Sequence, residues 1–297
     1  MRRRPASWLP LLAIAILLAT ACAPTEESTQ PTGSAGPEQT AGSGAPVDAC
    51  EDPQTFKPAV LTVATDSPAY EPWFSNDDPA NGKGFESAVA YAVAEEMGFS
   101  ADKVEWITVP FNTSYQPGSK NFDFDINQIS INARRAQAVT FSKGYYSAAQ
   151  AIITLKDSDY AGASSLADFK DAQLGAQVGT TSLDAISDTL QPSPQPQVFD
   201  DTNVAKNALQ NGQVDGIVTD LPTAFYITAV EIPQGTIVGQ FQPQTGTTEE
   251  FGLLFEKGNS LVSCADQAIA TLQDDGTLAD IEDQWLSQVV DVPQLAP

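Results

Sequence analysis

Short apolar runs of strand length alternate with helical patterns along most of this chain, and this alternation restricts its fold more than any other feature. A helix is expected where Phe85, Val89, Val93 and Met97 recur every four residues, with Gly98 placed to end it. Repeated strand, helix, strand order is typical of α/β proteins, whose mostly parallel sheets have helices on both faces. We expect strands at residues 59–64, 104–109, 122–129, 151–155, 174–178 and 216–218.

Further helices are expected at residues 182–190, 203–210, 260–272 and 277–289. In the last of these, Leu278, Ile281, Trp285 and Val289 form an apolar stripe, which predicts packing against a core. The folded part, from about residue 56 to residue 290, is long enough for one large core or for two lobes.

The first residues have the composition of a secretory signal. Three Arg at residues 2–4 precede an apolar stretch at residues 11–18, and small residues lead up to Cys22. This order predicts a signal peptide at residues 1–21, which is short for a membrane span. Residues 19–22 resemble a bacterial lipobox, which implies that Cys22 is lipidated and that the exported protein is anchored to the outer face of the cell membrane. An unlipidated secreted protein is the alternative.

Residues 22–55 are expected to form a lipidated, disordered tether. No aromatic or large aliphatic residue occurs between Ala23 and Val47. Such a segment buries too little apolar surface to offset the entropy lost on ordering. The tether would hold the folded part away from the membrane.

The three cysteines divide into one lipid site and one pair. If Cys22 carries the lipid, Cys50 and Cys264 remain. In an exported protein two remaining thiols most simply form a disulfide, here joining the start of the folded part to a helix near its end. Two buried free thiols are the alternative.

The charge and the missing residue types exclude several functions. The chain has 14 Lys and Arg against 38 Asp and Glu, a formal net charge of −24, which becomes −27 without the three Arg of the signal peptide. This field disfavours nucleic acid and anionic lipid as partners. The absence of His excludes a Ser-His-Asp triad and any His-ligated metal, and no P-loop motif occurs. We expect no cofactor and no metal.

Candidate binding residues directly follow the expected strands, where α/β sheets bind ligands. Each alone is also a common turn former or helix cap. Together with Arg135 they can hold both charged groups of a free amino acid, because a guanidinium and backbone N–H groups bind a carboxylate and an acid binds an ammonium. The set comprises Asp66, Ser130, Gly179, Thr180, Thr181 and Asp220. We interpret the neighbouring Arg134 as a solvated surface residue.

Four segments carry a resemblance to a known family: SINARRAQAVTFSKGYY, GAQVGTTSLDAI, NGQVDGIVTDLPTAFY and DDGTLADIEDQWL. The chain resembles the extracellular substrate-binding proteins of polar amino acid ABC importers over residues 61–286. The resemblance implies a two-lobed periplasmic binding protein of type II. Lobe 1 would comprise residues 56–147 and 243–290, lobe 2 residues 148–242, and the hinges would lie near residues 148–151 and 239–243. Residues 291–297 would be a C-terminal tail.

The same resemblance assigns roles to single residues. It implies that Arg135 binds the carboxylate of the ligand, that residues 179–181 form an anion-binding turn, and that Asp220 binds the ammonium. Asp66 would contact the amine or the side chain of the ligand. Tyr70, Trp73 and Phe111 would contact its aliphatic part, although Trp73 and Phe111 are also typical core residues. The chain departs from the family pattern at Gln128, which replaces Gly, and at Ala133, which replaces Pro.

The expected ligand is glutamine or a basic amino acid. A ligand with an acidic side chain would require a second cation, whereas Gln128 and Gln177 suit polar groups. The resemblance further implies a monomer that is not an enzyme and that docks on membrane permease subunits driven by a separate ATPase. Two alternatives remain: a dehydratase acting on prephenate or arogenate, with Asp66 or Asp220 as general acid, and a ligand sensor for a membrane receptor.

Overall fold

The computed structural model describes residues 50–51, 53–243, 248–286 and 292–297. The predicted signal peptide at residues 1–21, the lipid site Cys22 and the predicted tether up to residue 49 lie outside this part of the chain. Residues 287–289 of the last predicted helix also lie outside it. Within the described ranges, every helix is too short or too polar to cross a membrane.

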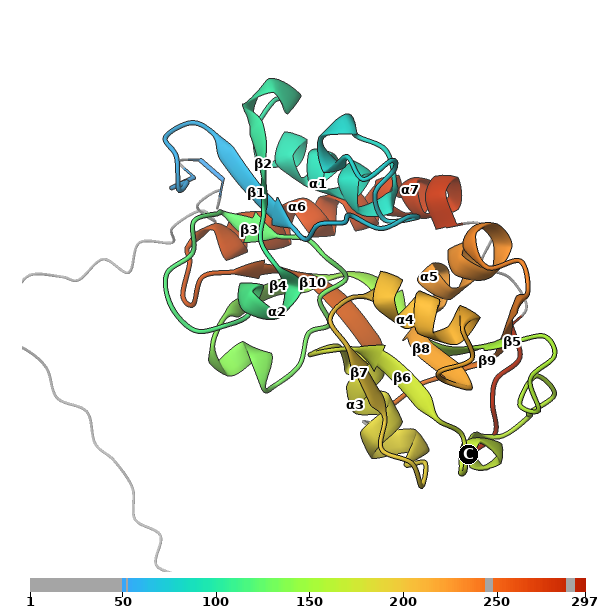
Figure 1. Cartoon of the computed structure of the whole chain (residues 1–297). Coiled ribbons are helices and arrows are strands. Elements are labelled where there is room, and N and C mark those ends of the chain that lie inside the picture. The colour runs from blue at the N-terminus through green and yellow to red at the C-terminus, as the bar shows by residue number, and fades with distance from the viewer. Residues whose placement is uncertain (1–49, 52, 244–247, 287–291) are drawn as a thin grey trace, which may run out of the picture. The chain divides into compact units, whose positions relative to one another are not determined.

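The first sheet contains five strands in the order β2-β1-β3-β10-β4 (Figure 1). Strand β1 pairs in parallel with β2 and β3, whereas β10 pairs antiparallel with β3 and β4. Four of the five strands therefore run in one direction, as a mostly parallel sheet requires. The strands are β1 (Leu61–Thr65), β2 (Val104–Thr108), β3 (Phe124–Asp125), β4 (Thr140–Ala148) and β10 (Glu249–Phe255).

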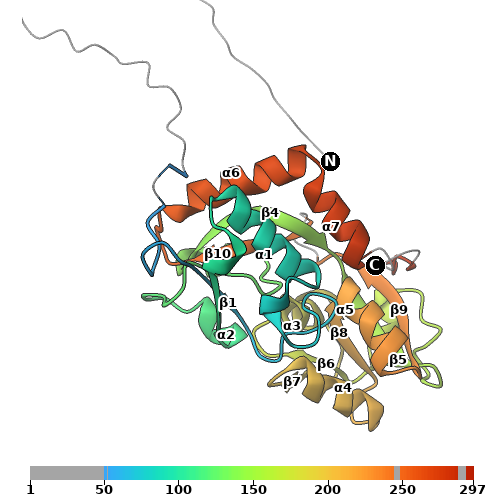
Figure 2. The same cartoon turned by 90° about the horizontal axis from the view of Figure 1, so that it is seen from above.

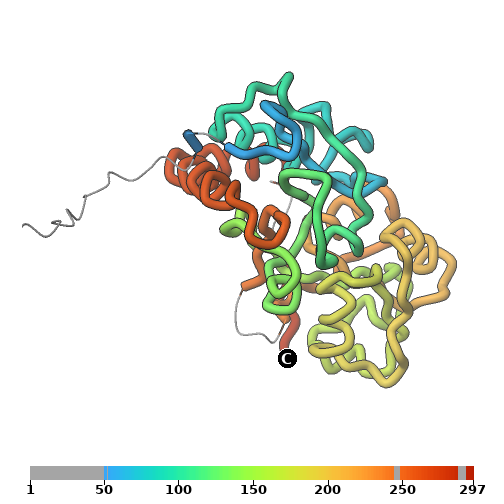
Figure 3. Tube along the Cα trace, turned by 90° about the vertical axis from the view of Figure 1, so that its left-hand side faces the viewer, coloured from blue at the N-terminus to red at the C-terminus, as the bar shows by residue number. Residues whose placement is uncertain are grey.

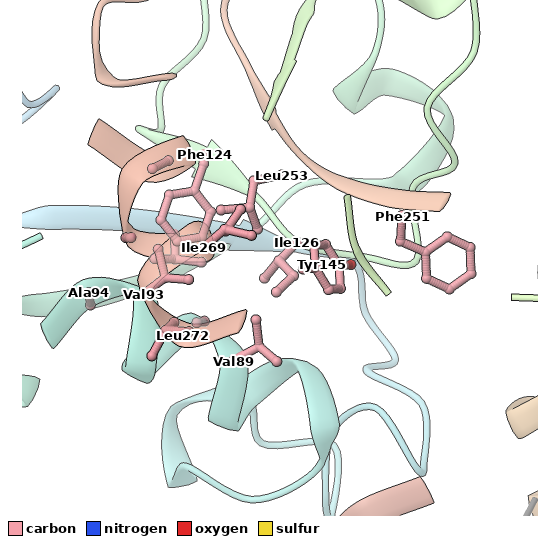
Figure 4. Close-up of a cluster of buried hydrophobic side chains, with 14 of the residues drawn as sticks. Val89, Val93, Ala94, Phe124, Ile126, Tyr145, Phe251, Leu253, Ile269 and Leu272 are labelled. Carbon is pink, nitrogen blue, oxygen red and sulfur yellow. The ribbon is translucent and has the colours of Figure 1, made fainter. Parts of the chain in front are cut away.

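Three helices from opposite ends of the chain pack together beside this sheet (Figure 2): α1 (Phe85–Glu96), α6 (Leu261–Asp274) and α7 (Thr277–Leu286). Apolar residues of α1 and α6 face the sheet residues Phe124 and Leu253 in one core (Figure 4). The red C-terminal helices thus lie beside the blue and cyan N-terminal segments (Figure 3). Shorter elements are η1 (Pro79–Asn81), η2 (Ala101–Lys103), α2 (Phe111–Ser114) and η3 (Arg135–Gln137).

The second sheet repeats this plan in the order β7-β6-β8-β5-β9. Strand β6 pairs in parallel with β7 and β8, and β5 runs antiparallel to both of its neighbours. The strands are β5 (Gln150–Leu155), β6 (Leu174–Gln177), β7 (Gln197–Phe199), β8 (Gly216–Asp220) and β9 (Gly235–Phe241). The helices are η4 (Leu166–Phe169), α3 (Thr181–Ala185), α4 (Thr202–Gln210) and α5 (Leu221–Tyr226), and the π-helical turns η5 (Ile186–Leu190) and η6 (Ile227–Glu231) extend α3 and α5.

The two sheets fall in the residue ranges predicted for lobe 1 and lobe 2, and we use these names below. The chain passes from the first sheet to the second between Ala148 and Gln150. It returns between the end of β9 at Phe241 and the start of β10 at Glu249. The exact lobe and hinge boundaries stay a prediction.

The strand expected at residues 122–129 is wrong in extent, because β3 contains only Phe124 and Asp125. Gln128 has a φ of +47°, in the left-handed region that an extended strand cannot contain. The chain therefore turns out of the sheet after two paired residues. This turn brings Asn127 and Gln128 to the end of the sheet where the candidate site lies.

The last residues of the chain pack against lobe 2. Gln294 forms a parallel bridge with Gln240, and Ala296 forms one with Ser165. Leu295 between them is only 6% exposed and belongs to a lobe 2 core. A Cβ at Gly239 would lie 2.5 Å from Leu295 Cγ, so glycine is the residue that permits this close approach.

The predicted disulfide between Cys50 and Cys264 is confirmed, with a Cα–Cα distance of 4.9 Å. Cys264 lies in α6 and is fully buried. The bond therefore attaches the beginning of the folded part to the helical layer of lobe 1. The alternative of two free thiols is wrong.

Candidate functional site

A small cavity of about 50 Å³ lies where residues of the two lobes meet. Such a volume has room for a few water molecules, so a larger ligand requires the lobes to move apart. Eight of the eleven predicted ligand-binding residues line the cavity, and Trp73, Arg135 and Gly179 do not. Its walls are formed by Asp66, Tyr70, Phe111, Asn127, Gln128, Ser130, Gln177, Thr180, Thr181, Ser182, Thr202, Val218, Thr219, Asp220 and Thr223.

Asp66 follows β1 directly and reaches the cavity from lobe 1. Its Oδ1 accepts a hydrogen bond from the Ser67 N–H at 2.7 Å, and its Oδ2 accepts one from the Phe111 N–H at 3.2 Å. Burial raises the pKa of this carboxyl in spite of the two backbone donors, which lower it. One of its oxygens thereby fixes the start of α2.

Tyr70 and Phe111 form an aromatic wall on the lobe 1 side. Lys206 of lobe 2 places its Nζ 5.8 Å from the centre of the Tyr70 ring. The same ammonium lies 2.7 Å from both carboxylate oxygens of Glu231, so its charge is paired within lobe 2. Burial raises the pKa of Tyr70, which keeps its hydroxyl neutral.

Trp73 lies behind the cavity wall, with no exposed surface. Its ring makes edge contacts with Phe85, Tyr146 and Phe251, with centroid distances of 5.6–5.8 Å. The indole Nε1 donates to the Thr223 Oγ1 of lobe 2 at 2.8 Å. The geometry thus places Trp73 in the lobe 1 core and against a cavity-lining residue, and gives no support to the expected ligand contact.

Arg135 is 3% exposed and joins the two lobes. One guanidinium nitrogen donates to the Ser130 carbonyl at 2.8 Å, and the other donates to the Gly179 carbonyl at 2.9 Å. The guanidinium carbon also lies 4.8 Å from the centre of the Tyr115 ring, which is a cation–π distance. Burial lowers the pKa of Arg135, and the group remains a cation far above neutral pH. The donors that a carboxylate would need are present, but here they bind carbonyl groups.

The turn before α3 presents hydroxyl groups to the cavity. Gly179 has a φ of +75°, and a Cβ there would lie 2.2 Å from the Tyr115 hydroxyl, so any other residue would be strained and would displace Tyr115. Thr180 caps α3 by accepting from the Leu183 N–H at 3.2 Å. The Thr181 and Ser130 hydroxyls lie 3.1 Å apart across the lobes.

Asp220, at the end of β8, is held by a residue that the sequence did not suggest. Gln150 donates from Nε2 to Asp220 Oδ1 at 3.2 Å and to Glu249 Oε2 at 2.8 Å, and its Oε1 accepts from Ser182 Oγ at 2.7 Å. Burial and the nearby Glu249 raise the pKa of Asp220 well above its usual range. An incoming ammonium would relieve this unfavourable burial of negative charge.

Glu86 is the second residue that sequence reasoning missed. It is fully buried in the first turn of α1 and accepts hydrogen bonds from Gln128 N at 2.7 Å and from the Tyr145 hydroxyl at 2.5 Å. Gln128 Nε2 donates to its other oxygen. Burial raises the pKa of Glu86 to about 7. An acid inside an apolar helical pattern was the signal that could have identified it.

The charged groups on the cavity wall are both acids, Asp66 and Asp220. Such a wall favours ligand groups that donate hydrogen bonds or carry positive charge. Within the described part of the chain, no three Cys, Asp or Glu side chains are arranged to hold a metal ion.

Comparison with known proteins gives the family. The L-cystine-binding protein TcyJ of Escherichia coli strain K12 is 26% identical over 226 residues, which cover 73% of this chain and 79% of that protein. A solved ancestral arginine-binding protein bound to glutamine is 28% identical, with a TM-score of 0.64 over 77% of this chain and 98% of that one. The ancestral amino acid-binding protein AncCDT-1, a precursor of cyclohexadienyl dehydratase, is 26% identical, with a TM-score of 0.63 over 77% and 95%.

The family model of the bacterial extracellular solute-binding proteins, family 3, matches residues 61–288. This range contains both sheets and every residue of the cavity wall. The chain therefore belongs to the bacterial extracellular solute-binding proteins of family 3.

Proposed function

We propose that this protein captures a polar amino acid between its lobes and delivers it to the permease of an ABC importer. The observation that carries the proposal is the cavity at the meeting of the two sheets, with Asp66 and Asp220 on its wall and Arg135 beside it. These groups match the ammonium and the carboxylate of an amino acid. Relatives that bind cystine, arginine and glutamine support the ligand class.

To capture a ligand, the protein must exchange hydrogen bonds between its lobes for hydrogen bonds to the ligand. When the lobes part, Arg135 loses the Gly179 carbonyl, and Ser130 loses the Thr181 hydroxyl. The carboxylate of the ligand then takes the place of the carbonyl as the acceptor for Arg135, in a charge-assisted pair that is stronger than the bond it replaces. Contacts with the second lobe then stabilise the closed state around the ligand.

Glutamine or a basic amino acid fits the wall best. An acidic side chain would meet Asp66 and Asp220 with no cation on the wall to offset the repulsion. Amide, guanidinium and ammonium groups supply the donors that the two carboxylates accept. The amide groups of Asn127 and Gln177 add polar contacts.

The cell would hold this receptor at the membrane through a lipid on Cys22, as a monomer beside permease subunits with a separate ATPase. A sensor that reports the ligand to a membrane receptor would use the same capture step and differ only in its partner. Reconstitution with candidate permeases in vesicles distinguishes the two roles, because only an importer receptor drives uptake.

A dehydratase acting on prephenate or arogenate is the second candidate. AncCDT-1, a structural neighbour, is an amino acid-binding protein and a precursor of cyclohexadienyl dehydratase. Asp66 and Asp220 have raised pKa values, which suits a general acid. Formation of product from either compound by the purified protein would favour this candidate, and its absence in a protein that binds amino acids would exclude it.

Calorimetric titration with the twenty common amino acids tests the proposal. We expect a small set of polar amino acids to bind with roughly micromolar dissociation constants, which correspond to about −8 kcal/mol. At millimolar concentration such a ligand adds about 4 kcal/mol of stability, a large thermal shift. If none of the twenty binds to a folded, ligand-free sample, the proposal is wrong.

Two neighbouring arginines provide a matched pair of variants. Arg135→Ala removes the charge-assisted pair with the ligand carboxylate, of about 1.5–3 kcal/mol, so we expect binding to weaken about 10- to 100-fold. Arg134→Ala removes an exposed ion pair with Asp184 and should change binding less than about fivefold. If the two variants weaken binding equally, Arg135 does not hold the ligand. Thermal unfolding verifies that each variant is folded.

A further inference from the structure

Gln128 lies on the cavity wall in a strained backbone conformation. Its φ of +47° is in the left-handed region, which a residue with a side chain adopts at a cost. Its backbone N–H and its side-chain Nε2 both donate to the carboxylate of Glu86. The conformation is therefore held by one buried acid on α1.

The orientation of the Gln128 carboxamide follows from the chemistry of this acid. Glu86 receives a third hydrogen bond from the Tyr145 hydroxyl, so all three of these groups donate to it. An ionised carboxylate only accepts hydrogen bonds, and a carboxamide has a donor end and an acceptor end. With its NH₂ end turned to Glu86, Gln128 leaves its carbonyl oxygen as the end that faces the cavity.

We propose that Glu86 is a positioning residue that orients the Gln128 carbonyl toward the ligand, so that the site selects amino acids whose side chains donate hydrogen bonds. The inference rests on the proposed function, since it concerns the side chain of a bound amino acid. Asp66 and Asp220 add two further acceptors to the same wall. A ligand whose side chain only accepts hydrogen bonds would place its oxygen against the Gln128 carbonyl oxygen. In a desolvated site, both oxygens would then lack a hydrogen-bond donor.

Selectivity between ligands is the measurement that tests this orientation. We would titrate the purified protein by calorimetry at pH 8, where Glu86 is mostly ionised, using L-glutamine and L-arginine as donor probes and L-methionine sulfoxide as an acceptor-only probe. We expect the tighter donor probe to bind at least tenfold more tightly than the sulfoxide. The ratio of the two dissociation constants reports orientation, because a general loss of stability would weaken both ligands.

Two variants change the carboxamide in different ways. In Glu86→Gln the new amide can donate to Gln128, which allows the Gln128 carboxamide to turn round, and we expect the ratio to fall about tenfold. Gln128→Gly removes the carboxamide, and glycine suits the positive φ. Because this variant keeps the negative charge of Glu86, a change in the ratio cannot come from a lost attraction between that charge and the ligand. We expect the ratio to fall about as much as in Glu86→Gln. Tyr145→Phe is the matched control, because it removes a bond to Glu86 without touching Gln128, and should leave the ratio unchanged.

The outcomes separate this inference from the proposed function. If no amino acid binds to the wild-type protein, the proposed function fails and the inference fails with it. If amino acids bind but the sulfoxide is not disfavoured, or if the ratio survives in Gln128→Gly, the inference alone is wrong. If the Glu86→Gln variant fails to fold, the ratio of dissociation constants measured for Gln128→Gly decides whether the inference is right.

Discussion

Glu86 couples the stability of the folded protein to pH. Burial raises its pKa to about 7 from an ordinary value of 4.5, so between these pH values the folded protein holds a proton that the unfolded chain has released. The free energy of unfolding should therefore fall as pH rises from about 4.5 to 7, by about 3 kcal/mol from this residue. Asp125 and Asp220, whose pKa values burial also raises, act in the same direction.

Urea unfolding at pH 5 and pH 8 measures this effect. Glu86→Gln cannot ionise, so we expect the stability lost between the two pH values to be about 3 kcal/mol smaller in this variant than in the wild-type protein. Glu96→Gln changes an exposed acid on the same helix and should keep the wild-type difference. If both variants lose the same stability as the wild-type protein, Glu86 is not the responsible group.

The residues that sequence reasoning placed on the cavity wall share one property: most directly follow strands. Because the carboxyl ends of neighbouring strands meet, Asp66 and Asp220 are brought to the same place by topology alone. The direction in which a long side chain points depends instead on tertiary packing. Arg135 and Trp73 therefore lie off the wall, and Glu86, which looked like part of an apolar helix, lies behind it.

At the scale of single elements, the C-terminal tail is part of the lobe 2 fold. Leu295 is buried against Gly239, and truncating a buried leucine removes apolar contacts and leaves a cavity. We expect Leu295→Ala to lower the free energy of unfolding by about 2–3 kcal/mol. Gln294→Ala changes an exposed neighbour and should stay within about 0.5 kcal/mol of the wild-type value. If Leu295→Ala keeps the urea midpoint of the wild-type protein, as Gln294→Ala should, the tail contributes no stability.

Two of the predicted strands, β1 and β8, are buried on both faces. β1 and β8 are apolar runs with almost no exposed surface, and their pattern is plain in the sequence. β4 was missed because polar residues such as Lys143 interrupt it, and β10, which pairs antiparallel with it, begins with two glutamates. The position of β10 between β3 and β4 brings together residues more than 100 positions apart, which no local pattern reveals.

At the scale of the whole molecule, the two lobes are held together by bonds that a bound ligand need not supply. Trp73 of lobe 1 donates to Thr223 of lobe 2, next to the aromatic residues Tyr146 and Phe251 of the strands that approach the hinges. A hydrogen bond of this kind contributes about 1 kcal/mol to the closed state. Because the lobes close on every ligand in the same way, the bond should strengthen the binding of all ligands by the same factor.

Trp73→Phe removes this bond while keeping an aromatic ring in the core. We expect calorimetry to show about fivefold weaker binding of every amino acid that the wild-type protein binds, with unchanged ratios between ligands. Trp106→Phe is the matched control, because the Trp106 indole donates to the Tyr91 hydroxyl within lobe 1, so its loss should leave affinity unaltered. A changed ratio between ligands in Trp73→Phe would instead indicate direct contact with the ligand, as the sequence led us to expect. An equal loss in both variants would show that the bond between the lobes has no special effect on closure.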